Sequence, residues 1–284
     1  MGMVAIVTDS TVCLPPNEAH ELSAVIVPHH LIFEGQDYRD GVDLSARDFY
    51  RMLRQVKRPP LTSAPSVGEY VQAYREAAET AENVLCITLP SRLSHAYSAA
   101  RSAAEQVSPQ IPVHVLDSQT VAAGQALVVI AAARRARHGD LKAVLGEATQ
   151  AIRNVRFAAF LDTLVYARAS GRIPGVVAWI SSALDLKPLL TVKAGEVRRL
   201  GIARTRQGAI RRLLEFARSA VGPEAPVRAV VQHTDAAEEA ERVLAEVQRD
   251  HRCLESWLTE FTPVMGAHSG PGVLSLALCP VTEA

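Results

Sequence analysis

The segment VLCITLPSRLSHAY, residues 84–97, predicts a buried strand, a Pro-Ser turn and the beginning of a helix. Four apolar residues open the segment, and alanines at helical spacing follow the turn. A strand joined directly to a helix is the building unit of α/β folds. Ser91 and Ser94 lie where a new helix has unpaired backbone N–H groups, so the turn suits a small anion. The alternative is that one of these serines only caps its own helix.

The same unit recurs along the first half of the chain. Apolar runs predict further strands at 4–7, 24–27, 31–33 and 113–116, and helical patterns cover 47–56, 66–82 and 140–154. Ser66 and Glu69 form a predicted capping box at the beginning of the second of these helices. Strand–helix alternation of this kind predicts a largely parallel sheet with flanking helices on both faces.

The pattern changes after residue 155. We expect strands at 156–161, 189–192, 197–200, 227–231, 254–260 and 273–278, and helices at 163–169, 175–184, 207–220 and 236–249. This order predicts a second sheet that is mixed or antiparallel, again with helices. Because 284 residues are enough for two α/β domains, we expect an N-terminal α/β domain at 1–155 and a C-terminal α/β domain at 156–284.

Composition excludes several classes of protein. Thirty basic and thirty acidic side chains cancel, which argues against a dedicated nucleic-acid binder. Four widely spaced cysteines without a CxxC pair predict neither a zinc site nor a disulfide framework, and so favour a cytoplasmic location. His29 and His30 are adjacent and would face opposite ways in a strand, so we expect no metal site there. The apolar stretch 121–133 is too short to span a bilayer, and no leader, Walker A or GxGxxG motif is present.

Polar turns stand beside the predicted buried elements at 8–11, 62–66, 91–94, 117–118, 170–172 and 268–272. Those at 8–11, 91–94 and 117–118 follow parallel strands, so we expect them to meet at the carboxyl edge of one sheet. Hydroxyls and N–H groups with Arg172 and His268 suit the holding of an anion better than a reaction on it. Each has a simpler alternative: Asp9 as a turn residue, Ser10 or Thr11 as a cap, Arg172 as a surface charge, and His268 as a core histidine or a turn residue at a strand end.

In this order and spacing, the motifs resemble those of the DegV family, bacterial fatty-acid-binding proteins that serve as binding subunits of fatty acid kinase. The resemblance rests on TDST at 8–11, TSAPS at 62–66, SRLSHAY at 91–97, DS at 117–118, SGRI at 170–173, KPLL at 187–190 with Gly195, and HSGPG at 268–272. It implies a two-domain fold with a long-chain fatty acid between the domains. It also implies that Thr62 and Ser94 hold the carboxylate, assisted by the backbone N–H of His95, with Arg172 and His268 beside the same head group.

The resemblance further implies a non-catalytic lipid-binding protein with no cofactor, which acts in phospholipid metabolism. A separate kinase catalytic subunit would phosphorylate the bound carboxylate to an acyl-phosphate. The chain departs from the family pattern at His95 and Ala96, where Gly-Thr is usual, at Ala122, where Ser is common, and at Ser170, which replaces a Gly. These changes leave the main head-group donors in place.

Two other functions remain open from the residues alone. A serine-dependent hydrolase or acyltransferase could use Ser94 and His268 with Asp117, because α/β-hydrolases follow the order Ser, Asp, His. However, Ser94 is not in a G-x-S-x-G elbow. The third candidate is a carrier for a different apolar anion that has no kinase partner.

Overall fold

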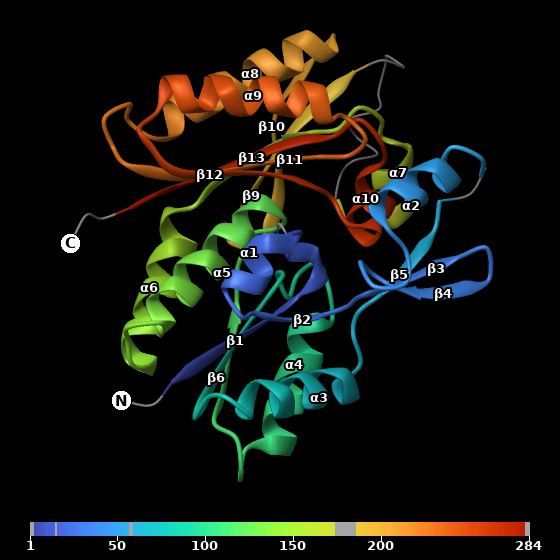
Figure 1. The fold of residues 1–284 in the computed structure, drawn as a ribbon. Coiled ribbons are helices and arrows are strands. Elements are labelled where there is room, and N and C mark those ends of the chain that lie inside the picture. Colours follow the sequence, from blue (N-terminus) through green and yellow to red (C-terminus); the bar gives the residue numbers. More distant parts are fainter. Residues whose placement is uncertain (1–2, 15, 57–58, 174–185, 282–284) are drawn as a thin grey trace.

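The computed structural model describes residues 3–14, 16–56, 59–173 and 186–281. These residues form a four-stranded, a six-stranded and a three-stranded sheet. The two larger sheets lie one above the other, with helices between them and on their outer faces (Figure 1). The three-stranded sheet lies to one side of this stack.

The N-terminal sheet is entirely parallel, as its strand–helix alternation predicts. Its order is β2 (Val25–Val27), β1 (Val4–Asp9), β6 (Asn83–Thr88) and β7 (Val113–Asp117). Helices α3 (Val67–Ala78) and α4 (Ala96–Val107) bury their apolar faces against its outer side. The 3-10 helix η1 (Ser10–Val12) and the helix α1 (Pro16–Glu21) follow β1. Because the strands are parallel, the ends of β1, β6 and β7 meet at one edge.

The C-terminal sheet is mixed, which confirms the expectation for the second half. Its order is β10 (Glu196–Ala203), β9 (Lys187–Lys193), β8 (Arg156–Phe160), β13 (Leu274–Pro280), β11 (Val227–His233) and β12 (Cys253–Glu260). Only the β11–β12 pair in this sheet is parallel. Helices α8 (Arg206–Ala220) and α9 (Ala237–Asp250) cover its outer face (Figure 1).

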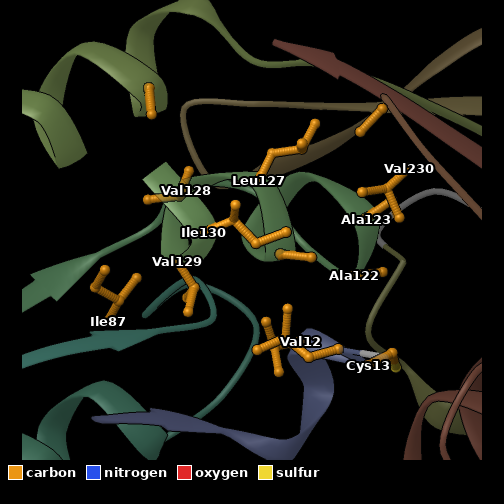
Figure 2. Close-up of a cluster of buried hydrophobic side chains, with 14 of the residues drawn as sticks. Val12, Cys13, Ile87, Ala122, Ala123, Leu127, Val128, Val129, Ile130 and Val230 are labelled. Carbon is orange, nitrogen blue, oxygen red and sulfur yellow. The ribbon is translucent and has the colours of Figure 1, made fainter. Parts of the chain in front are cut away.

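Helices α5 (Ala123–Ala136) and α6 (Leu141–Asn154) lie between the two sheets. Figure 2 shows Leu127 and Ile130 of α5 in a cluster with Ile87 of β6 and Val230 of β11. The longest apolar stretch of the sequence is therefore a core helix. Among the described residues, no helix combines the length and apolar character that a membrane span requires.

The three-stranded antiparallel sheet is not predicted by the sequence analysis. Its order is β4 (Gln36–Arg39), β3 (His30–Phe33) and β5 (Leu61–Ser63), so the expected strand at 31–33 is correct but belongs to this extra sheet. Side chains of α2 (Ala46–Leu53) and α10 (Pro263–Ser269) form a small core with β3, and α7 (Val165–Ser170) packs on α10. This core joins the two halves of the chain.

Two local predictions differ in outcome. The Ser66–Glu69 capping box is present at the beginning of α3. The prediction that this helix continues to residue 82 is wrong: it ends at Ala78, because the N–H groups of Glu82 and Asn83 instead donate to the Met3 carbonyl beside β1. The helix expected at 175–184 lies outside the described residues.

Candidate functional site

The turns after β6 and β7 meet at the carboxyl edge of the parallel sheet. Both the N–H and the hydroxyl of Ser91 donate to Oδ2 of Asp117, at 3.0 and 2.7 Å. The N–H of Ser118 donates to the Thr88 carbonyl at 3.0 Å. The expected meeting of these turns is confirmed, and the Asp117 carboxylate fixes the beginning of the Pro90–Ser94 turn.

The turn after β1 is buried, and its side chains form hydrogen bonds with neighbouring segments instead of an anion site. Asp9 is fully buried, and its carboxylate accepts from the N–H of Thr11, the N–H of Leu89 and Nε2 of Gln125, at 3.1, 2.8 and 3.3 Å. Asp9 is also the N-cap of η1. Asp9 therefore has a structural role, and the cap is Asp9 itself rather than Ser10 or Thr11. Through Leu89, this carboxylate also holds the beginning of the turn that leads to Ser94.

Ser94 lies just before α4, at the position that its sequence predicts. Its Oγ accepts a hydrogen bond from the N–H of Ala96 at 3.1 Å, so it bonds the helix start as a cap would. That bond uses an oxygen lone pair and leaves the hydroxyl proton available for donation. His95 is the N-cap residue and is exposed, whereas Ser94 is partly buried.

Thr62 and His268 are in direct contact although they are 206 residues apart. Oγ1 of Thr62 lies 2.9 Å from Nε2 of His268. Thr62 is on β5, and His268 is in the last turn of α10. Nδ1 of His268 is buried and has no partner among the described residues. Burial, together with the charge of Arg172 and of His29, lowers the pKa of His268 from 6.5 to about 4.

A cavity of about 130 Å³ lies between the two halves of the chain. Leu89, Leu93 and Val121 line it from the N-terminal half, and residues such as Phe157, Leu190 and Val192 line it from the C-terminal half. Its polar lining residues are Arg172, His268 and Ser269.

The structure therefore gathers part of the expected site. Arg172 and His268 share the cavity, and Thr62 contacts His268. Ser94 and His95 directly follow the lining residue Leu93, but no hydrogen bond among the described residues joins them to Thr62 or His268.

A family model for an uncharacterised protein of the DegV family matches residues 3–281. The chain belongs to the DegV family. A DegV domain-containing protein of Deinococcus radiodurans is 34% identical over 282 residues, which cover 98% of this chain and 99% of the relative.

Solved DegV structures share the whole fold. A DegV family protein from Thermus thermophilus, described as fatty acid binding, superposes with a TM-score of 0.91 at 28% identity and covers 98% of this chain and 100% of its own. DegV of Bacillus subtilis, described as a fatty acid binding protein, gives a TM-score of 0.90 at 28% identity, with 99% and 100% coverage.

The structure does not show the hydrogen bonds that a serine hydrolase would need between Ser94, His268 and Asp117 among the described residues. The Asp117 carboxylate accepts from Ser91 and from the N–H of Gln119, and His268 contacts Thr62. Among the described residues, neither is hydrogen-bonded to Ser94, so these side chains do not form a Ser-His-Asp triad. Nowhere in the part of the chain that the structure describes do three or more His, Cys, Asp or Glu side chains lie where they could hold a metal ion.

Sequence reasoning missed the polar residues that support the site. Gln125 is the one polar residue in the apolar run 121–133, and its amide donates to Thr8 and to Asp9. Asp40 accepts from the hydroxyl of Ser10 and from the N–H of Val264 at the beginning of α10. A single polar residue in an apolar run is a signal that could have identified Gln125; Asp40 gives no comparable signal.

The histidine in the cavity predicts an acid-sensitive contribution to stability. The pKa of His268 is lower in the folded protein than in the unfolded chain, so protonation of this histidine favours unfolding. The contribution of the neutral ring to stability is fully present above about pH 6.5 and is lost as the pH falls toward 4. At about pH 5 the loss should be about 2 kcal/mol. Urea unfolding at about pH 7.5 and 5 should therefore show a smaller pH dependence in His268→Gln than in the unmodified protein. An equal pH dependence in both would contradict the prediction.

Proposed function

We propose that this protein binds a long-chain fatty acid in the cavity between its two large sheets. The observation that carries the proposal is an apolar cavity that also contains Arg172 and His268, with Thr62 hydrogen-bonded to that histidine. An apolar lining with a few polar groups is typical of a site for an amphipathic ligand. The fatty-acid-binding description of the Thermus and Bacillus proteins supports the same ligand class for this chain.

The carboxylate is held by hydroxyl groups in this proposal. Thr62 and Ser94 donate to its oxygens, the N–H of His95 assists, and Arg172 and His268 lie beside the same head group. Hydroxyl and N–H donors need no charge of their own, and the nearby guanidinium favours the ionised acid. Oγ of Ser94 accepts from the N–H of Ala96, and Oγ1 of Thr62 accepts from Nε2 of His268 when that nitrogen carries the proton, so both hydroxyls keep their protons for the acid.

The tail supplies most of the affinity. At about 0.8 kcal/mol per buried methylene, a long acyl chain contributes on the order of 10 kcal/mol, and ordering and association costs offset much of it. The cavity of about 130 Å³ is smaller than the roughly 300–1,000 Å³ of most ligand pockets. The lining walls of the two halves therefore separate when the acid enters, and the head group fixes its orientation.

The bound acid is presented to a separate fatty acid kinase catalytic subunit, which converts the carboxylate to an acyl-phosphate. This protein contributes binding and orientation, without a metal or another cofactor, and acts in the cytoplasm in phospholipid metabolism. The Asp117–Ser91 and Thr62–His268 contacts favour this function over a hydrolase. The identity of the bound ligand distinguishes the proposed function from that of a carrier for a different apolar anion.

Two measurements test the ligand. The purified protein is denatured and extracted with organic solvent, and mass spectrometry should identify a long-chain fatty acid. Delipidated protein should also bind added oleate or palmitate. If no acid co-purifies and neither acid binds, the proposal is wrong; a different extracted anion would favour the third candidate.

Removing the two head-group hydroxyls should weaken binding. We expect Thr62→Ala combined with Ser94→Ala to reduce oleate affinity at least about tenfold, since each lost hydrogen bond to a carboxylate is worth more than one between neutral groups. Ser98→Ala is the control, because Ser98 is exposed on α4, the helix that follows Ser94, and donates to the His95 carbonyl. With a bacterial fatty acid kinase catalytic subunit and ATP, the double variant should also form less acyl-phosphate. Unchanged affinity and turnover would place the head group elsewhere.

A further inference from the structure

The carboxylate of Asp40 is buried directly after β4, and the head-group assignments above do not use it. Only 2% of the surface of Asp40 is exposed. Its Oδ2 accepts from the hydroxyl of Ser10 at 2.7 Å, and its own N–H donates to the carbonyl of His29 at 2.8 Å. Oγ of Ser10 also accepts from the N–H of His29 at 3.0 Å. These bonds fix the place of the Asp40 carboxylate, and they give Ser10 of the TDST motif a structural role.

The other oxygen of this carboxylate caps a helix in the second half of the chain. Oδ1 of Asp40 accepts from the N–H of Val264 at 2.9 Å, across 224 positions of sequence. Val264 is the second residue of α10, where a backbone N–H has no partner inside the helix. The N-cap residue, Thr262, makes no side-chain cap hydrogen bond. A carboxylate is a strong acceptor for an N–H at the positive end of a helix, so Asp40 takes the place of a local cap.

This helix carries His268 about one turn after Val264. Nε2 of His268 lies 2.9 Å from Oγ1 of Thr62, and α10 packs on β3 and β5 beside α2 (Figure 1). Val264 and Ala267 add apolar burial there, but apolar contacts have no preferred direction. A hydrogen bond depends on both distance and angle. The bond from Val264 to Asp40 therefore fixes where α10 begins, and the helix carries that position on to His268.

We propose that Asp40 is a positioning residue for the head-group site, because it holds α10, and with it His268, against Thr62. The proposal rests on the fatty-acid function proposed above. Asp40 is not among the described residues that line the cavity, and it acts through the N–H of Val264. This bond keeps α10 with the three-stranded sheet when the lining walls separate, so the Thr62–His268 pair moves as one unit.

The test uses oleate and the delipidated full chain. Asp40→Ala removes both acceptor oxygens, whereas Asp40→Asn keeps one oxygen for Val264 and can donate its amide to Oγ of Ser10. We expect Asp40→Ala to weaken oleate binding about tenfold and Asp40→Asn to restore most of the affinity.

Glu18→Ala is the matched control. Glu18 is also a buried carboxylate that joins the two halves, since it accepts from Nε1 of Trp257 at 2.7 Å. Neither Glu18 nor Trp257 is among the described residues that line the cavity. Glu18→Ala should therefore lower the stability and leave the oleate affinity unchanged.

A measurement without ligand separates positioning from a general loss of stability. In delipidated protein labelled with ¹⁵N in its histidines, Asp40→Ala should shift the ring nitrogens of His268, and Glu18→Ala should not. Ser10→Ala should shift the same nitrogens less, because it leaves both oxygens of Asp40 in place. Ser10→Ala provides the same comparison if Asp40→Ala does not fold.

The inference is overturned if folded Asp40→Ala, or Ser10→Ala in its place, keeps the His268 signals or the oleate affinity of the unmodified protein. It is also overturned if Glu18→Ala disturbs His268 to the same extent, or if Asp40→Asn is as weak as Asp40→Ala. Absence of oleate binding by the unmodified protein would instead refute the proposed function. The His268 signals of the ligand-free variants would still decide whether Asp40 positions α10.

Discussion

Replacement of Asp9 by alanine should lower the free energy of unfolding by about 3–5 kcal/mol. The fully buried carboxylate accepts from two backbone N–H groups and from the side chains of Thr11 and Gln125. Alanine leaves these donors buried without an acceptor, and an unsatisfied buried donor costs far more than a lost surface contact. Chemical denaturation at neutral pH measures the change.

Two further variants isolate the reason for the loss at Asp9. Asp9→Asn keeps one acceptor oxygen but turns an amide N–H₂ group toward donors, so its stability should lie between those of alanine and aspartate. Asp43→Ala removes an exposed carboxylate that pairs with Arg39 and should leave the denaturation midpoint nearly unchanged. If Asp9→Ala is as stable as Asp43→Ala, the buried donors do not depend on Asp9.

The large sheets could be predicted because each strand carries its own apolar signal. The strands β1, β6 and β13 are almost wholly buried and mainly apolar, and helices such as α4 and α6 bury apolar residues at helical spacing. β4 and β5 give no such signal: Gln36–Arg39 is polar, and Leu61–Ser63 is short and largely exposed. These two strands form because β3 lies between them and supplies the hydrogen-bond partners. Local patterns could not show that.

The candidate site likewise has a part that local sequence predicts and a part that it does not. The helix start at Ser94 is a local feature and is where the sequence predicts it. The contact between Thr62 and His268 joins residues 206 positions apart, so spacing and periodicity could not predict it. Only the resemblance to the DegV family placed the two residues at one head group. The supporting contact between the Asp9 carboxylate and the N–H of Leu89 depends on tertiary packing and became visible only in the structure.

Replacement of Gly270 by alanine should lower the free energy of unfolding by about 3 kcal/mol or more. Gly270 follows α10 with φ +78° and ψ 178°, a backbone conformation that is essentially restricted to glycine. A Cβ there would lie 2.4 Å from Cδ2 of Tyr166 on α7, so backbone strain and a collision with a ring add together. Relief of this collision should shift α10, and the shift should displace His268 and weaken oleate binding. Chemical denaturation and oleate titration measure the two effects.

Gly171→Ala separates the two causes at Gly270. Gly171 also has a positive φ, +63°, but a Cβ there meets nothing within 4 Å, so this variant should lose only about 1 kcal/mol. Adding Tyr166→Ala to Gly270→Ala should relieve the collision but not the strain, because only the ring is removed. Their coupling energy should then be favourable, whereas independent sites would give simple addition of the two losses. An additive pair, or equal losses in Gly270→Ala and Gly171→Ala, would show that the Tyr166 ring does not limit the space behind α10.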